Sequence, residues 1–335
     1  MDHRQLGRTG LHVSEICQGT MTFGFQRDEP ASFAILDRAI EGGVDFIDTA
    51  DVYPLGGTLE TVGRTEEIIG RWMKERRNRD RIILATKCAG AMGPGSNDQG
   101  LSRRHIHNAV DASLRRLQTD VIDLYQVHWF DPRTPIEETM RALDDLVRWG
   151  KVRYVGCSNF PAWRLGQALA ASDRLGVARY DSLQPRYNML YRDIETELLP
   201  LVRAEGLGVI VYNPLAGGFL SGKHQKGEEP PENTRFNLGG AARMYRHRYW
   251  QDEQFDAVDE LRSAVDARGQ DMVGVAVQWV LSQPGITSAI VGASSPDQLD
   301  ASLAAPDTQI DDDLRIICDG LWLKLSRRPV IEGYR

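Results

Sequence analysis

Short apolar runs alternate with amphipathic segments along most of the chain. The apolar runs predict strands over residues 15–19, 44–48, 81–87, 121–128, 152–158, 180–184, 207–212 and 288–293. The segments with helical periodicity predict helices over residues 31–42, 64–77, 102–118, 135–149, 161–175, 193–205, 252–282 and 296–304. Strands that alternate with helices pair in parallel, and eight such units favour an α/β fold, the (β/α)8 barrel.

Three segments stand outside this alternation. The N-terminal RQLGRTGLHVS predicts a β-hairpin, residues 310–335 predict a partly helical C-terminal tail, and residues 217–250 form a long Gly/Pro-rich connection typical of a binding loop. Because no change in composition marks a linker, we expect one barrel domain over residues 1–335. The alternative, a doubly wound dinucleotide-binding sheet, requires G-x-G-x-x-G after the first strand, and QGTMTFGF lacks it.

Composition narrows the class of protein further. With 41% hydrophobic and 26% charged residues the chain has enough apolar material for a core, and its net charge of −7 disfavours nucleic acid or an anionic membrane as partner. The sequence has no run of about 18 apolar residues, so we expect neither a signal peptide nor a membrane span. Cys17, Cys88, Cys157 and Cys318 lack metal-ligand spacing, so we expect no metal, no disulfide and a reducing, cytoplasmic location.

Four reactive side chains stand where predicted strands end. Asp48 ends the second strand and Tyr53 follows it, while Lys87 and His128 end the third and fourth strands. Each alone is compatible with a structural role, as a helix cap, a packing ring or a core histidine. The carboxyl ends of barrel strands meet at one face, however, and buried charges need partners. We therefore expect the four side chains to form one site.

The chemistry of such a group is specific. A free tyrosine has a pKa of about 10, and an ammonium ~4 Å away favours the phenolate by roughly 4 kcal/mol before desolvation is subtracted. We expect Lys87 to lower the pKa of Tyr53 by up to about three units, with Asp48 as the counter-ion of Lys87. His128 would donate a hydrogen bond to a substrate oxygen. The group is suited to protonating a carbonyl oxygen as a hydride reaches the carbon.

These residues resemble the Asp-Tyr-Lys-His tetrad of the aldo-keto reductases, which are NADPH-dependent (β/α)8 barrels. GVDFIDTADVY and MRALDDLVRWGKVRYVGCSN are similar to the two signatures of the family, and QPRYN, VYNPLAGGFLSGKH and IVGASSPDQL follow in the family's order. GLSRRHI, DPRTPIEETMRAL and GAS at 292–294 are more similar to the branch that contains the potassium-channel β-subunits. The resemblance spans nearly the whole chain and implies reduction of an aldehyde or ketone with NADPH.

The resemblance also implies a cofactor site. The residues implied near the nicotinamide are Gly19, Thr20, Met21, Asp48, Ser158, Asn159, Gln184 and Tyr212. Those implied around the pyrophosphate and the adenosine are Asn213, Pro214, Leu215, Gly217, Leu220, Gly222, Lys223, Arg235, Gly292, Ser294 and Gln298. GGFLSGKH also approaches the P-loop pattern, but His224 replaces the hydroxyl that would bind Mg²⁺.

The chain departs from the family pattern at three places. PLGGTLETVGRT follows Tyr53 where relatives have only a few residues, so the pocket rim is expected to differ. The basic residue that many members place near 292–294 is absent, and Ala301 and Ser302 replace a Glu-Asn pair that contacts adenine. NADH therefore stays an alternative to NADPH.

Several questions stay open in the sequence. A cofactor-binding regulatory subunit that acts through protein contacts is the main alternative to an enzyme, although the channel subunits have Asn in place of His128. A metal-dependent barrel hydrolase lacks ligands at the strand ends. Phe23, Trp129, Phe130 and Tyr245 are the predicted substrate-pocket residues; other candidate rim residues are Met21, Phe25, Tyr187 and Trp250. Sugars, steroid-like polycycles, quinones and small aldehydes all fit such a wall, and a monomer or a homo-oligomer is possible.

Overall fold

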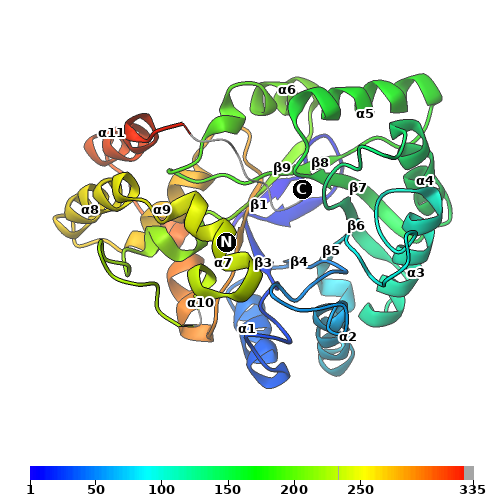
Figure 1. Cartoon of the computed structure of the whole chain (residues 1–335), viewed down its shortest axis with the longest axis horizontal. Coiled ribbons are helices and arrows are strands. Elements are labelled where there is room, and N and C mark those ends of the chain that lie inside the picture. Colours follow the sequence, from blue (N-terminus) through cyan, green and yellow to red (C-terminus); the bar gives the residue numbers. More distant parts are fainter. Residues whose placement is uncertain (233, 328–335) are drawn as a thin grey trace.

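Each predicted apolar run forms one strand of a closed barrel, as a computed structural model covering residues 1–232 and 234–327 shows (Figure 1). The strands are β3 (Ile16–Gly19), β4 (Phe46–Asp48), β5 (Ile83–Cys88), β6 (Ile122–Val127), β7 (Val152–Ser158), β8 (Ser182–Gln184), β9 (Gly208–Tyr212) and β10 (Ser288–Val291). All neighbours pair in parallel, and β10 pairs with both β9 and β3, which closes the ring. The predicted (β/α)8 barrel is confirmed.

Helices surround the barrel on its outside (Figure 1). The crossover helices are α1 (Glu29–Glu41), α2 (Arg64–Arg76), α3 (Arg103–Leu117), α4 (Ile136–Arg148), α5 (Ala162–Leu175), α6 (Leu198–Glu205), α8 (Asp252–Asp266), α9 (Met272–Leu281) and α10 (Pro296–Leu303). The prediction of one helix over 252–282 was wrong. Gly269, with a φ of +61°, lies between the two helices. The Asp271 side chain caps the start of α9, because it accepts a 2.7 Å hydrogen bond from the Gly274 N–H.

The predicted N-terminal hairpin is confirmed. It consists of the antiparallel strands β1 (His3–Gln5) and β2 (His12–Ser14), which close the amino end of the barrel. Leu6 and Val13 are fully buried in the cluster of side chains that fills the barrel interior. The backbone comes so close that a Cβ on Gly208 would lie 2.5 Å from the Leu6 side chain. The hairpin therefore packs closely against the amino end of β9.

The long connection after β9 contains structure of its own. It includes the 3₁₀ segments η3 (Ala216–Ser221) and η4 (Arg235–Asn237) and the helix α7 (Gly239–Tyr249). Five rings of this region contact one another and are called the ring cluster below: Phe219, His224, Phe236, Trp250 and Phe255. The cluster fixes the connection beside the mouth of the barrel.

The remaining predictions concern the tail and the cysteines. The C-terminal tail forms α11 (Asp312–Leu321) and η6 (Trp322–Lys324), and residues 328–335 of the predicted tail lie outside the described residues. All four cysteines are buried as free thiols. In the described part of the chain, no helix combines the length and the apolar character needed to cross a membrane.

Candidate active site

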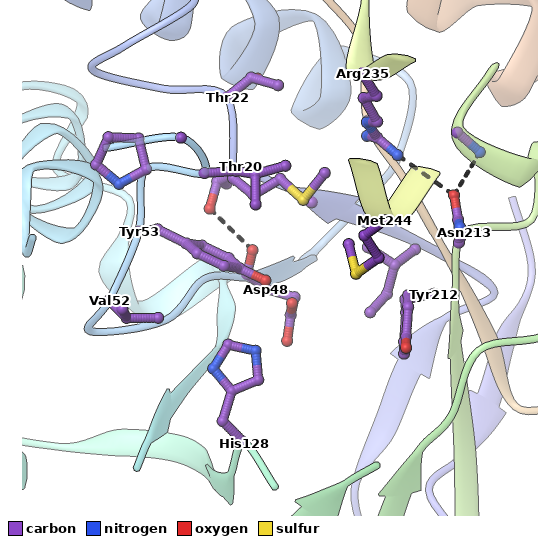
Figure 2. A pocket seen from close by; sticks show the side chains of 18 of the residues that line it. Thr20, Thr22, Asp48, Val52, Tyr53, His128, Tyr212, Asn213, Arg235 and Met244 are labelled. Carbon is purple, nitrogen blue, oxygen red and sulfur yellow. Dashed lines mark hydrogen bonds between the residues drawn. The ribbon is translucent and has the colours of Figure 1, made fainter. Parts of the chain in front are cut away.

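The carboxyl ends of the strands surround a cavity of about 1170 Å³. Asp48, Tyr53 and His128 line it, and their side chains converge in the lower centre of Figure 2. Lys87 lies beneath them with no exposed surface. The four residues that the sequence marks at strand ends are therefore brought together.

The Asp48–Lys87 pair is the electrostatic centre of the group. The Lys87 ammonium lies 2.5 Å from Asp48 Oδ2 and donates a second hydrogen bond of 2.8 Å to the Thr49 carbonyl. The other carboxylate oxygen of Asp48 accepts hydrogen bonds from the amides of Gln126, at 3.1 Å, and Gln184, at 2.8 Å. A buried ion pair needs further hydrogen bonds to offset its desolvation, and Thr49, Gln126 and Gln184 supply three of them.

Tyr53 packs against this pair. Its ring centroid lies 5.2 Å from the Lys87 ammonium nitrogen and 5.8 Å from the His128 ring, which it meets edge-on. Burial, followed by the charge of Asp48, raises the pKa of Tyr53. The expected net fall in this pKa was wrong, because desolvation of the phenolate and the Asp48 charge outweigh the effect of the Lys87 ammonium. Tyr53 therefore holds its proton at neutral pH.

His128 stays neutral in the same environment. Its side chain is buried, and desolvation together with the Lys87 charge lowers the pKa of the imidazole well below its usual value. The His128 backbone N–H donates to the Cys88 carbonyl at 2.8 Å, which fixes the residue at the end of β6. A neutral imidazole still has one N–H to donate to a ligand oxygen.

A chain of hydrogen bonds connects four of the predicted nicotinamide residues. The Tyr212 hydroxyl donates to Asn159 Oδ1 at 2.8 Å, and the Asn159 amide donates to Ser158 Oγ at 2.9 Å. Ser158 in turn donates to the Gln184 carbonyl at 2.7 Å. Asn159 has a φ of +57°, in the left-handed region that asparagine tolerates. The strand ends of β7, β8 and β9 are thus held in one fixed arrangement.

The connection after β9 presents two cations to the cavity. Asn213 Oδ1 accepts from the Gly217 N–H at 2.6 Å and from Arg235 at 3.4 Å, as drawn at the right of Figure 2. Within the described residues neither Lys223 nor Arg235 has a carboxylate partner. Burial and the nearby Arg235 lower the pKa of Lys223. Two close cations without counter-ions favour an anionic ligand such as a phosphate.

The far end of the cavity lies at β10. A Cβ on Gly292 would come within 3.3 Å of the Arg235 guanidinium, so glycine leaves room for that group. Ser294 and Gln298 also line the cavity and bond to each other, Oγ to Oε1, at 2.5 Å. Arg235 thus reaches the region where the sequence lacks the basic residue at 292–294.

Most of the predicted cofactor residues line the cavity, but two do not. The lining residues are Gly19, Thr20, Met21, Asp48, Ser158, Asn159, Gln184, Tyr212, Asn213, Pro214, Leu215, Gly217, Lys223, Arg235, Gly292, Ser294 and Gln298. Leu220 is fully buried, and Gly222 ends η3 with a φ of +74°; neither lines the cavity. Both shape the connection rather than the cavity wall.

Three of the four rings predicted for the substrate pocket line the cavity. Trp129, Phe130 and Tyr245 line the cavity, whereas the Phe23 ring is fully buried in the core between barrel and helices. Phe23 points inward because its loop folds back through a Gly24 N–H to Arg27 carbonyl hydrogen bond of 2.7 Å. Among the other candidates, Tyr187 stacks on Trp279, Trp250 belongs to the ring cluster and Phe25 is 52% exposed.

The structure adds residues that sequence reasoning missed. Gln126 precedes His128 by two positions on β6, so strand periodicity alone would have placed it on the same face. The Tyr249 hydroxyl accepts hydrogen bonds from the side-chain amides of Asn188 and Asn213, both at 3.1 Å. Met244 on α7 lines the cavity opposite Tyr53 in Figure 2, and no sequence signal marks it.

The segment that follows Tyr53 forms part of the cavity wall. Its lining residues are Pro54, Leu55, Gly56, Gly57, Thr58, Leu59 and Val62. A Cβ on Gly56 would lie 3.3 Å from both Phe25 and Leu238, so this segment touches the loop after β3 and the connection after β9. Within the described residues, no three His, Cys, Asp or Glu side chains form a group that would hold a metal ion.

Comparison with known proteins agrees with this geometry. The profile of the Aldo/keto reductase family matches residues 15–322. The chain is 38% identical over 325 residues to the uncharacterized oxidoreductase YrpG of Bacillus subtilis, with 95% of each chain covered. It is 37% identical over 310 residues to a probable voltage-gated potassium channel subunit beta of Arabidopsis thaliana, with 92% of each chain covered.

A fungal enzyme is similar over the same length. The versiconal hemiacetal acetate reductase of Aspergillus parasiticus is 33% identical over 329 residues, which cover 91% of this chain and 92% of that protein. The family match and the identities together span the barrel and the connection after β9. The chain belongs to the aldo/keto reductase family, whose members are oxidoreductases of carbonyl substrates.

Proposed function

We propose that the protein reduces an aldehyde or ketone to the alcohol, with NADPH as hydride donor and Tyr53 as proton donor. The observation that carries the proposal is the buried Asp48–Lys87 pair beneath Tyr53, with His128 beside it at the bottom of the cavity. The group combines a protonated hydroxyl, a fixed positive charge and a neutral hydrogen-bond donor at one point.

Each side chain has a separate role in the proposed reaction. Ser158, Asn159 and Gln184 would hold the nicotinamide of NADPH, which would supply a hydride to the carbonyl carbon. The Tyr53 hydroxyl donates its proton to the carbonyl oxygen, so the products are the alcohol and a Tyr53 phenolate. The Lys87 ammonium stabilises this phenolate, and His128 donates a hydrogen bond that orients the carbonyl oxygen. Asp48 is the counter-ion of the buried Lys87 ammonium.

The free-enzyme pKa of Tyr53 sharpens this assignment. Because burial raises the pKa, the hydroxyl is fully protonated at neutral pH and available as an acid. The proton leaves only when negative charge develops on a substrate oxygen in hydrogen-bond range. The site is therefore suited to reduction at neutral pH.

The cavity fits a phosphorylated dinucleotide. Lys223 and Arg235 supply uncompensated positive charge, and the Gly217 and Gly218 backbone, both with positive φ, lets a ligand approach closely. Arg235 beside Gly292 and Ser294 provides donors for a phosphate on the ribose. We therefore favour NADPH over NADH.

Replacing Tyr53 by Phe tests the chemistry. Loss of the proton donor is expected to lower kcat by about 10²- to 10⁴-fold on reactive aldehydes, measured by the disappearance of NADPH absorbance. NADPH affinity, measured by fluorescence titration, should stay within about twofold of wild type because the ring remains. Undiminished turnover in Tyr53→Phe would overturn the mechanism.

Replacing Arg235 by Ala tests the cofactor. Loss of a charge-assisted hydrogen bond is expected to weaken NADPH binding by about 10-fold or more and NADH binding much less. An equal loss for both cofactors would assign Arg235 to the shared pyrophosphate and contradict the proposed preference. Ser294→Ala provides a milder variant at the same end of the cavity.

A regulatory subunit with little turnover is the second candidate, favoured by the similarity to a probable potassium channel subunit beta. His128 argues against it, since the site keeps a hydrogen-bond donor for a substrate oxygen. Tight NADPH binding without turnover of any carbonyl would support this second candidate instead.

A further inference from the structure

A buried carboxyl group lies in the chain between two members of the proposed site. Asp51 stands three positions after Asp48 and two before Tyr53, and it is fully buried. Val52 and Tyr53 line the cavity and are drawn at the left of Figure 2, whereas Asp51 is not a lining residue. The Asp51 backbone N–H donates to the Lys87 carbonyl at 3.0 Å. Asp51 is therefore held in the wall behind the reacting groups.

The Asp51 carboxyl group has no cation of its own. Among the described residues, no side chain donates a hydrogen bond to either of its oxygens. The cations whose charges act on it are Arg116 and Lys87. Arg116 donates to Glu66 at 2.7 Å, and Lys87 is paired with Asp48 at 2.5 Å. Both cations are thus already engaged by other carboxylates.

The surroundings of Asp51 favour its neutral form. The titratable groups that face it are Glu66 on α2, Arg116 on α3, Lys87 and Cys88 on β5, and Tyr125 on β6. Burial, followed by the charge of Glu66, raises the pKa of Asp51 well above its usual value, although the Arg116 charge and the Val52 N–H act in the opposite direction. Burial also raises the pKa of Cys88 and of Tyr125, so both stay neutral. A buried carboxyl group without a partner takes up a proton rather than a charge.

A neutral aspartic acid destabilises the fold at neutral pH. Its pKa is higher in the folded chain than the ~3.9 of the unfolded chain, so stability falls as pH rises above about 4. The buried Asp123 shows the alternative: its carboxylate accepts from the Leu84 N–H at 2.9 Å and pairs with Arg79, at 2.8 Å, and with Arg153. A buried acid left without such partners beside a reaction centre is a candidate functional group.

The charge of Asp51 acts on the proposed proton donor. An ionised Asp51 raises the pKa of Tyr53, in the same direction as the Asp48 charge. A tyrosine of higher pKa is a weaker acid, and its phenolate would form close to a further negative charge. The Lys87 ammonium, which already pairs with Asp48, would have to offset both carboxylates. Proton donation from Tyr53 therefore requires an uncharged Asp51.

We propose that Asp51 is a positioning residue that acts through Tyr53: its carboxyl group is neutral while the enzyme turns over, and its ionisation in alkali suppresses proton donation by Tyr53. The inference rests on the proposed reductase function. Asp51 loses its proton to solvent, and it neither touches the substrate nor exchanges electrons with it. The site thus contains a pH-sensitive group separate from the residues that carry out the reaction.

The pH dependence of turnover tests the proposal, with 4-nitrobenzaldehyde as probe and NADPH at saturation. In wild type, kcat at pH 10 is expected to be at least about 10-fold lower than at pH 7. Asp51→Asn keeps the shape of the side chain and cannot ionise, so its kcat should change by less than about twofold over the same range. An equal alkaline loss in wild type and Asp51→Asn would overturn the proposal.

Thermal unfolding tests the neutral acid without using activity. Relative to wild type, the Tm of Asp51→Asn should rise by about 5 °C or more between pH 5 and pH 8.5, because the variant has no proton to retain. Asp123→Asn is the matched control: it should lower the Tm at pH 8.5, since Arg79 and Arg153 lose their partner, and keep the alkaline loss of kcat seen in wild type. A Tm difference between Asp51→Asn and wild type that does not depend on pH would contradict a neutral Asp51.

Infrared spectroscopy of wild type supplies a direct signature. The carbonyl stretch of a protonated carboxylic acid should be present at pH 7, disappear in parallel with kcat towards pH 10, and be absent from Asp51→Asn at pH 7. Its absence from wild type at pH 7 would overturn the proposal even if Asp51→Asn does not fold. If wild type shows the band and the pH-dependent Tm but reduces no carbonyl at any pH, the reductase function fails while Asp51 is still a neutral acid.

Discussion

Two neighbouring regions of the barrel mouth are stabilised in opposite ways. At the strand ends, the buried charges of Asp48 and Lys87 pair with each other and form hydrogen bonds with Thr49, Gln126 and Gln184. In the ring cluster, contacts between rings dominate, with centroids 4.8–6.0 Å apart. Within the described residues neither ring nitrogen of His224 has a hydrogen-bond partner.

The difference teaches which properties each region controls. Directional hydrogen bonds fix atoms to within a few tenths of an ångström, which proton transfer needs, but a single lost partner leaves a buried charge. Ring packing tolerates small shifts and is suited to holding a connection over a cofactor. Substitutions at the strand ends should therefore affect chemistry and folding, and those in the ring cluster should affect cofactor affinity.

The largest effect is expected from Lys87→Met. This change leaves the Asp48 carboxylate buried without its cation, which costs about 3–5 kcal/mol in the free energy of unfolding. It also removes the charge that stabilises the Tyr53 phenolate, so kcat should fall by at least about 10³-fold. Urea unfolding and NADPH oxidation measure the two effects.

The double variant Asp48→Asn/Lys87→Met separates these effects. Removing both charges should recover most of the lost stability but none of the lost turnover. If the double variant is as unstable as the single one, the cost does not arise from an unpaired carboxylate, and the contrast between the two regions loses its electrostatic basis.

A smaller effect is expected from Phe236→Leu in the ring cluster. Phe236 is fully buried and contacts Phe219, His224 and Trp250. Loss of these edge contacts should cost about 1–2 kcal/mol and weaken NADPH binding several-fold, because Arg235 is the adjacent residue. With saturating NADPH, kcat should be unchanged.

Ile69→Val on α2 is the matched control for this variant. Ile69 is fully buried far along the chain from the ring cluster, and its truncation costs a comparable 0.5–1.5 kcal/mol. It should leave NADPH affinity unchanged. A similar loss of affinity in both variants would show that general destabilisation, rather than the ring cluster, limits cofactor binding.

The contrast also marks what the sequence could predict. The barrel follows from periodicity, since each strand carries an apolar run and each crossover a helical stripe. The positions of Asp48, Lys87 and His128 follow as well, because chain order alone places them at the carboxyl ends of parallel strands. Gln126 and Gln184 also lie near the carboxyl ends of their strands, where their amides donate hydrogen bonds to Asp48.

What escaped prediction depends on contacts between distant segments. The pKa of Tyr53 was expected to fall, but its direction is set by burial and by Asp48, which are properties of the folded site. Phe23 and Phe130 look alike in sequence, yet one is buried in the core and the other lines the cavity. The ring cluster draws on residues 219–255 without any period, so no sequence pattern indicated it.

The smallest effect is expected from His224→Phe and appears only in acid. His224 is 4% exposed, and desolvation together with the Lys223 charge lowers its pKa to about 4. The unfolded chain, with a pKa near ~6.5, therefore binds a proton that the folded chain does not, and stability falls as pH drops from about 6.5 towards 4. Lys223 and Arg262 are charged groups beside His224.

At pH 5.5 this linkage should cost wild type about 1 kcal/mol relative to pH 7.5. His224→Phe keeps a ring in the cluster and removes the titrating group, so its Tm should fall less between the two pH values than that of wild type. His3→Phe serves as control, because His3 is half exposed and pairs with Asp45 at 2.9 Å; it should not reduce the acid sensitivity. If the Tm of wild type and that of His224→Phe fall equally between pH 7.5 and pH 5.5, protonation of the His224 imidazole does not destabilise the protein. Packing alone would then determine the stability of the ring cluster.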